Sequence, residues 1–169
     1  MEKNEIMGFA YKEMDIPSFE VIGFTKITPS QVEAYQEILR NDDVKSEILR
    51  KIVKDKPLYC IKSRDKECPK DFWRYTIGKN NDDGHSENEE YKNELFTFQV
   101  KESKWLIFTL DVSKECILTG FIKFLHNDPY ETIWEAGYEP TTSIVRYIEV
   151  HKENYDGHEM EFWIPVKKR

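Results

Sequence analysis

The chain has 169 residues, enough for one domain with its own apolar core, so folding needs no disulfide or metal. Its formal net charge is −7 and its pI is about 5.2, which disfavours direct nucleic-acid binding because that function uses a basic face. No apolar run approaches the ~20 residues of a membrane helix, and the N-terminus is too polar for a signal peptide. These features favour a cytoplasmic protein with no membrane partner.

The first half of the sequence predicts a strand, a helical region and two more strands. Thr28 and Pro29 have the preferences of an N-cap and a first helical residue. The apolar spacing that follows predicts helix as far as Val53, with a break at residues 41–43. A polar surface loop is expected over 79–92. The predicted strands of this half are residues 18–27, 58–63 and 72–78.

The second half predicts a similar order, although no internal sequence identity supports a repeat. Ser113 is a plausible N-cap for a helix with Ile117 and Phe121 on its apolar face, Gly137 is a helix stop, and residues 154–157 form a turn. The predicted strands are residues 95–100, 104–112, 144–151 and 158–166.

This element order predicts an α+β fold in a single domain, residues 1–169. Two β-α-β-β units, approximately residues 16–92 and 93–169, are expected in a pseudo-twofold arrangement. Their antiparallel sheets would carry helices on one face, and the groove between the halves would be the natural ligand site.

The cysteines and histidines point to no metal site and no cofactor. Cys60, Cys68 and Cys116 are widely spaced, no CxxC pair exists, and the four histidines make no metal-ligand spacing with them. Free thiols in a reducing compartment are therefore expected.

The C-terminal run EMEFWIPVKKR, residues 159–169, combines alternating acidic positions with an Ile-Pro-Val-Lys-Lys ending. It resembles the closing strand of the GyrI-like, AraC-type effector-binding domains. Within the same family, WEAGYEP (134–140) resembles a Trp-Leu-Pro-x-Ser-Gly-Tyr-Glu segment, and IEVH (148–151) an Ile-Glu-x-Tyr strand. The remaining similar segments are residues 16–27, 75–79 and 103–110.

The resemblance implies a small-molecule effector-binding protein. Many relatives carry this domain behind an AraC-type or MerR-type DNA-binding unit, whereas here the similar region begins near residue 16, which implies a stand-alone form. Glu135-Ala136 replaces the family's Leu-Pro, and His151 replaces a tyrosine, so a ligand preference does not carry over.

The last strand offers a candidate carboxylate. Strand alternation places Glu159, Glu161 and Trp163 on one face, opposite Met160 and Phe162. The family keeps a pocket glutamate on this strand, and the resemblance implies that Glu161 takes that role. A carboxylate among aromatic rings suits a lipophilic cation. The alternative is a hydrated outer strand face.

Aromatic residues make up 14% of the chain, a surplus that a wide apolar pocket would use. Tyr75 could donate a hydrogen bond into the groove, and His151 could contact the ligand or act as a base. For each remaining candidate, ordinary core packing is the alternative. The candidate wall residues are Trp105, Phe108, Trp134, Tyr138, Tyr147 and Trp163.

Three functions stay open at this level. The first is a binding module for a lipophilic small molecule, either cationic or neutral. The second, implied by a branch of the same family, is a hydrolase of reactive electrophilic compounds, which pairing of Glu161 with Tyr75 or Tyr147 would favour. The third is a protein-interaction domain resembling the gyrase-inhibiting family members, which a clustered acidic face would favour.

Overall fold

The computed structural model describes residues 5–6, 9–41, 43–54, 57–81, 93–111, 133–141, 144–152 and 159–169. Its helical elements are α1 (Gln31–Tyr35), the π-helix η1 (Gln36–Asn41) and α2 (Asp43–Val53). Its strands are β1 (Glu5–Ile6), β2 (Phe9–Ile16), β3 (Phe19–Thr28), β4 (Leu58–Ser63), β5 (Trp73–Asn80), β6 (Phe96–Val100), β7 (Ser103–Asp111), β8 (Tyr138–Pro140), β9 (Val145–His151) and β10 (Glu159–Lys168).

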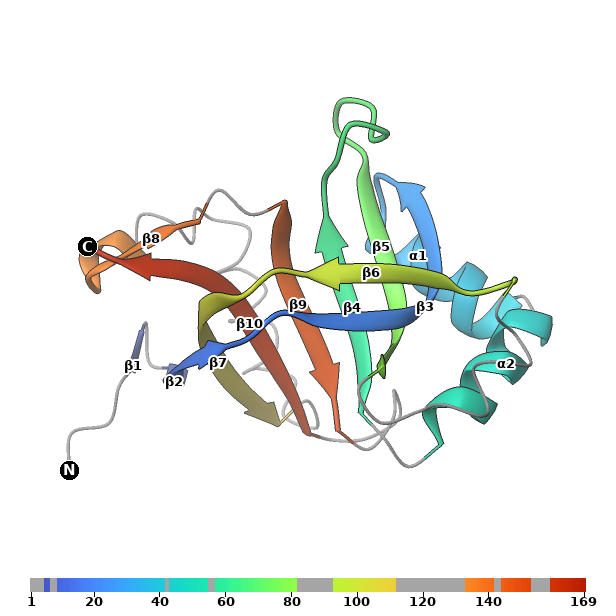
Figure 1. Cartoon of the computed structure of the whole chain (residues 1–169), viewed down its shortest axis with the longest axis horizontal. Coiled ribbons are helices and arrows are strands. Elements are labelled where there is room, and N and C mark those ends of the chain that lie inside the picture. The colour runs from blue at the N-terminus through green and yellow to red at the C-terminus, as the bar shows by residue number, and fades with distance from the viewer. Residues whose placement is uncertain are drawn as a thin grey trace.

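The described strands form one antiparallel sheet in the order β1-β2-β7-β10-β9-β4-β5-β3-β6, with β8 paired to β10 (Figure 1). Counted outwards from the β4–β9 pair, the order is β4-β5-β3-β6 on one side and β9-β10-β7-β2 on the other. The two sides therefore have equivalent strand orders, as a pseudo-twofold arrangement requires. Strands also cross between the halves: β2, which leads into the first half, pairs with β7 of the second, and β6 of the second half pairs with β3 of the first. The predicted α+β class is confirmed.

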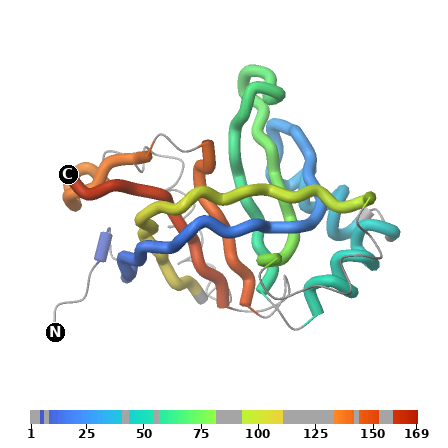
Figure 2. Tube along the Cα trace, viewed as in Figure 1, coloured from blue at the N-terminus to red at the C-terminus, as the bar shows by residue number. Residues whose placement is uncertain are grey.

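The sheet curls over an inner apolar cluster. Its residues come from strands far apart in the sheet order, among them Phe98 of β6, Tyr59 of β4, Trp105 of β7 and Trp163 of β10. In Figures 1 and 2, β6 and the first part of β3 cross over β4. The face that bears Tyr59 and Trp163 is the inner face of the sheet.

Helix α2 packs on the opposite face of the sheet. Its apolar side chains, including Leu49 and Ile52, form a second cluster with Cys60 of β4 and Ile77 of β5. Because neighbouring residues of a strand point to opposite faces, Cys60 and Tyr59 lie on different sides. We call the side that carries Cys60 the helix-covered face.

The close approach of β3 and β5 depends on two glycines. Gly23 and Gly78 are register partners, and a Cβ atom on either one would overlap backbone atoms of the opposite strand. Only glycine allows the two backbones to lie this close, which explains the glycine at position 78 of the YTIGK segment.

The first helix begins two residues later than predicted. Ser30, not Thr28, is the N-cap: its hydroxyl accepts a 3.2 Å hydrogen bond from the Glu33 amide. Thr28 instead ends β3, and its hydroxyl donates to the Glu33 carboxylate at 2.8 Å. Pro29 therefore precedes the cap, because strand pairing holds Thr28 and the Ser-x-x-Glu spacing favours Ser30.

The predicted strands are confirmed. The predicted break at residues 41–43 includes Asp42, which lies outside the described residues; η1 ends at Asn41 and α2 begins at Asp43. Strand β2 was not predicted, because the N-terminal segment is polar and its alternation is incomplete. The predicted helix after Ser113, most of the 79–92 loop and the 154–157 turn lie outside the described residues. Within the described part of the chain, no helix is long and apolar enough to cross a membrane.

Candidate functional site

A polar cluster lies on the helix-covered face where the two halves meet. Strands β4 and β9 pair at the centre of the sheet, with Cys60 opposite Glu149 and Lys62 opposite Tyr147. Helix α1 reaches this pair through Gln31 and Tyr35, which both donate to Glu149. We call the following group the Glu149 cluster: Gln31, Tyr35, Cys60, Lys62, Trp73, Tyr75, Tyr147, Glu149 and His151.

Glu149 is the buried carboxylate of the cluster, with 6% of its surface exposed. The Tyr35 hydroxyl donates to its Oε2 at 2.6 Å, and the Gln31 amide donates to its Oε1 at 2.8 Å. The Tyr147 hydroxyl in turn donates to Gln31 Oε1 at 2.6 Å. A buried carboxylate is costly unless such donors satisfy it, and here Tyr35 and Gln31 of the first half donate to a carboxylate of the second.

Lys62 places a cation on the aromatic side of the cluster. Its Nζ lies 4.5 Å from the centre of the Trp73 ring, 5.5 Å from that of Tyr147 and 5.9 Å from that of Tyr75. Burial lowers the pKa of Lys62, and the nearby Arg146 lowers it further, while Glu149 opposes the shift. Three rings thus already lie around one ammonium group, which also feels the negative charge of Glu149.

The tyrosines of the cluster are neutral hydrogen-bond donors. Burial raises the pKa of Tyr75 to about 12, and the charge of Glu149 adds to the shift. Burial also raises the pKa of Tyr35 and Tyr147 well above the ordinary tyrosine range. These phenols therefore keep their protons at neutral pH and can donate to acceptors.

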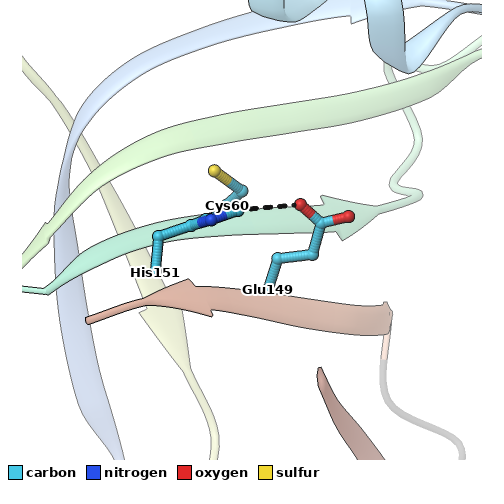
Figure 3. A group of neighbouring side chains, drawn as sticks. All are labelled: Cys60, Glu149 and His151. Atoms are coloured by element: carbon cyan, nitrogen blue, oxygen red, sulfur yellow. Dashed lines mark hydrogen bonds and ion pairs between the residues drawn. The ribbon is translucent and has the colours of Figure 1, made fainter. Parts of the chain in front are cut away.

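A thiol, a carboxylate and an imidazole meet at one side of the cluster (Figure 3). His151 Nε2 lies 3.3 Å from Glu149 Oε2, and Cys60 projects from β4 beside them. One potential ligand atom from each of the three residues lies within 4.8 Å of the other two, and all three residues are buried. These are atoms that can hold a transition metal, although the sequence spacing suggested none.

The structure divides the predicted ligand contacts. Tyr75, Tyr147 and His151 belong to the Glu149 cluster. Phe108 is in the apolar cluster that contains Tyr147 and Phe162. Trp105 and Trp163 lie instead in the inner cluster, with ring centres 5.9 Å apart.

Two further candidates lie away from the Glu149 cluster. Trp134 is 48% exposed, and its ring stacks against the Arg169 guanidinium at 4.4 Å. The Tyr138 hydroxyl donates to the Glu13 carboxylate at 2.7 Å. The Trp134–Arg169 contact joins the C-terminal end to the segment before β8, and the Tyr138–Glu13 bond joins β2 to β8.

Glu161 faces the opposite side of the sheet from Glu149. In the β9–β10 register Glu161 pairs with Val150, whereas Glu149 pairs with Phe162. Glu161 is buried, accepts a 3.1 Å hydrogen bond from Trp163 Nε1, and lies 3.4 Å from Lys152 Nζ. It therefore makes no pair with Tyr75 or Tyr147, and its predicted ligand role stays a prediction.

Sequence reasoning missed the carboxylate of the cluster. Glu149 stands between Tyr147 and His151 at two-residue spacing, so alternation alone puts all three on one face. That signal was available in the IEVH segment. The partners Gln31 and Tyr35 had no comparable signal, because only tertiary packing brings α1 to β9.

Comparison with known proteins gives one family and a set of similar folds. The sequence model of the family described as integron-associated effector binding protein matches residues 14–166. A search among curated proteins found no significant match.

Three solved structures illustrate the similarity in fold. SAV2435 bound to tetraphenylphosphonium is 14% identical, with a TM-score of 0.63 over 93% of this chain and 93% of that one. The EcmrR C-terminal domain is 17% identical, with a TM-score of 0.55 over 96% and 100%. An integron cassette protein from the mobile metagenome of Vibrio cholerae is 13% identical, with a TM-score of 0.53 over 93% and 95%.

Proposed function

Because the chain belongs to the integron-associated effector binding family, we propose that it binds lipophilic organic cations at the Glu149 cluster. One observation carries the proposal: a buried carboxylate lies beside aromatic rings that already hold an ammonium group. Rings attract a cation through their negative faces, and the carboxylate balances its charge. A cation with an apolar shell loses little hydration on entering such a site, which lowers the cost of binding.

The chemistry of one similar structure supports this ligand class. SAV2435 was solved with tetraphenylphosphonium, a cation enclosed by four phenyl rings. The same chemistry fits the rings of Trp73, Tyr75 and Tyr147 here. Lys62 is only half-buried, so its flexible side chain can move towards solvent as a ligand cation takes its place.

The two buried glutamates provide a matched test, since they lie on opposite faces of the sheet. Glu149→Gln is expected to weaken tetraphenylphosphonium binding at least ~10-fold, or about 1.4 kcal/mol, by isothermal titration calorimetry. Glu161→Gln is expected to leave affinity within about twofold. Circular dichroism and thermal unfolding of both variants check that each remains folded.

Each result of these titrations tests a different part of the proposal. If Glu149→Gln binds tetraphenylphosphonium as tightly as the wild type, the role assigned to the Glu149 carboxylate is wrong. If Glu161→Gln alone loses binding, the ligand carboxylate is on the inner face instead. If the wild type binds neither tetraphenylphosphonium nor smaller aromatic cations, the ligand class itself is wrong.

We also propose that the protein is cytoplasmic and makes no direct contact with nucleic acid. Cys60 and Cys68 are free thiols, as a reducing compartment favours, and the net charge of −7 opposes phosphate binding. Cell fractionation and a DNA-retention assay at low salt test these two points.

A further inference from the structure

We propose that Cys60, Glu149 and His151 form a binding site for a divalent transition metal of the zinc class. The three side chains come from the paired central strands β4 and β9, and their ligand atoms lie within 4.8 Å of one another (Figure 3). This property goes beyond organic-cation binding and does not depend on it, because Cys60 and His151 contribute donor atoms that an organic cation does not need.

The ligand set determines the kind of metal. A sulfur, an imidazole nitrogen and a carboxylate oxygen suit Zn²⁺ and similar ions, whereas Mg²⁺ and Ca²⁺ prefer oxygen ligands alone. The charges also balance: a 2+ ion with one thiolate, one carboxylate and a neutral imidazole leaves no net charge in a buried site. As the metal–sulfur bond forms, the thiol proton leaves to solvent.

One of the three distances between ligand atoms already has the value a metal would impose. In a tetrahedral zinc site the bonds are ~2.0–2.3 Å, so neighbouring ligand atoms lie about 3 to 4 Å apart. His151 Nε2 and Glu149 Oε2 are already 3.3 Å apart. The Cys60 ligand atom, Sγ, lies within 4.8 Å of a ligand atom of each of the other two residues. A small movement of the Cys60 side chain therefore completes the tetrahedral spacing.

Surrounding donors orient the carboxylate, as the outer shell of a metal site does. Gln31 Nε2 donates to Glu149 Oε1, and the Tyr35 hydroxyl donates to Oε2. With three protein ligands, the fourth coordination position is left for water or a small ligand, the arrangement of open zinc sites.

The test is a titration of the purified full chain with Co²⁺, a spectroscopic substitute for Zn²⁺. We expect one equivalent to produce a sulfur-to-cobalt charge-transfer band in the near ultraviolet, which Zn²⁺ then abolishes by displacement. Cys60→Ser should remove the band, and His151→Gln should weaken Co²⁺ binding at least ~10-fold. Cys68→Ser is the matched control and should retain the band, since Cys68 lies outside the site.

Two results would overturn the metal site: no charge-transfer band in the wild-type protein, or the same band in Cys60→Ser. The wild-type titration needs no variant, so a folding defect in Cys60→Ser cannot leave the question open. Tetraphenylphosphonium binding, measured in parallel on metal-free protein, separates the two proposals. A wild-type chain that binds the organic cation but no Co²⁺ overturns only the metal site, and the reverse result overturns only the proposed function.

Discussion

Tyr35 of helix α1 donates a 2.6 Å hydrogen bond to Glu149 of strand β9 and so joins the first helix directly to the central strand of the other half. With Gln31, it satisfies both oxygens of a carboxylate that is 6% exposed. The arrangement of the helix therefore decides whether this carboxylate can stay buried.

Removing the Tyr35 hydroxyl should destabilise the fold. Tyr35→Phe deletes one donor to a buried charge and is expected to lower the free energy of unfolding by about 1–3 kcal/mol, measured by urea denaturation. Tyr138→Phe is the control, because its acceptor Glu13 is partly exposed and water can replace the donor. Equal losses in the two variants would contradict the special role of Tyr35.

Removing the Lys62 ammonium should strengthen organic-cation binding. Lys62→Met deletes the positive charge that lies over Trp73 and Tyr147, so the incoming ligand meets neither competition nor repulsion there. We expect tetraphenylphosphonium affinity, measured by calorimetry, to rise by about threefold to tenfold. A tenfold rise corresponds to about 1.4 kcal/mol of binding free energy. Lys101→Met makes the same charge change at an exposed position and should have little effect. Weaker binding by Lys62→Met would show that the lysine contributes to the ligand site.

Alkaline pH should destabilise the protein partly through Tyr75. Its pKa is about 12 in the folded chain and ~10 when unfolded, so the unfolded state ionises first. The stabilising contribution is fully present below about pH 10 and is lost as the pH rises through about 12. Urea unfolding across this range should show a steeper fall in stability for the wild type than for Tyr75→Phe. Parallel curves would rule out a Tyr75 contribution.

The Gly23–Gly78 contact should not tolerate a side chain. Gly78→Ala places a methyl group against the β3 backbone and should cost about 3 kcal/mol or prevent folding, as measured by thermal or urea unfolding. Thr97→Ala on the exposed side of β6 is the comparison and should cost well under 1 kcal/mol. A Gly78→Ala protein as stable as Thr97→Ala would mean that β3 and β5 can separate at this point.

Local sequence signals predicted most described strands correctly. Runs such as 58–63 and 72–78 alternate or concentrate β-branched and aromatic residues, and they became β4 and β5. The exceptions arise where pairing between strands far apart in the sequence decides the structure. Thr28 has the residue type of an N-cap, but its pairing with Trp73 of β5 keeps it in β3. Strand β2 is too polar to be recognised from its sequence, and only its pairing with β7 identifies it as a strand.

The candidate site was only partly predictable. Tyr75, Tyr147 and His151 were singled out as separate residues, and the register of β4, β5 and β9 places them on one face. Glu161 was chosen because the family it resembles keeps a glutamate on this strand. Alternation put it on the face of Trp163, and in the structure Trp163 Nε1 donates to its carboxylate. Alternation could not say which side of the sheet that face would occupy.

The sequence by itself determined the α+β class, most of the strands and the family resemblance, because these depend on neighbouring residues and on period-two or helical spacing. Only the tertiary structure decided that Glu149, rather than Glu161, meets Gln31 and Tyr35, and that Cys60 lies beside His151. Those contacts depend on which strands pair and which face the helices cover. Burial of apolar surface over the whole chain decides both, and no local pattern of residues records the outcome.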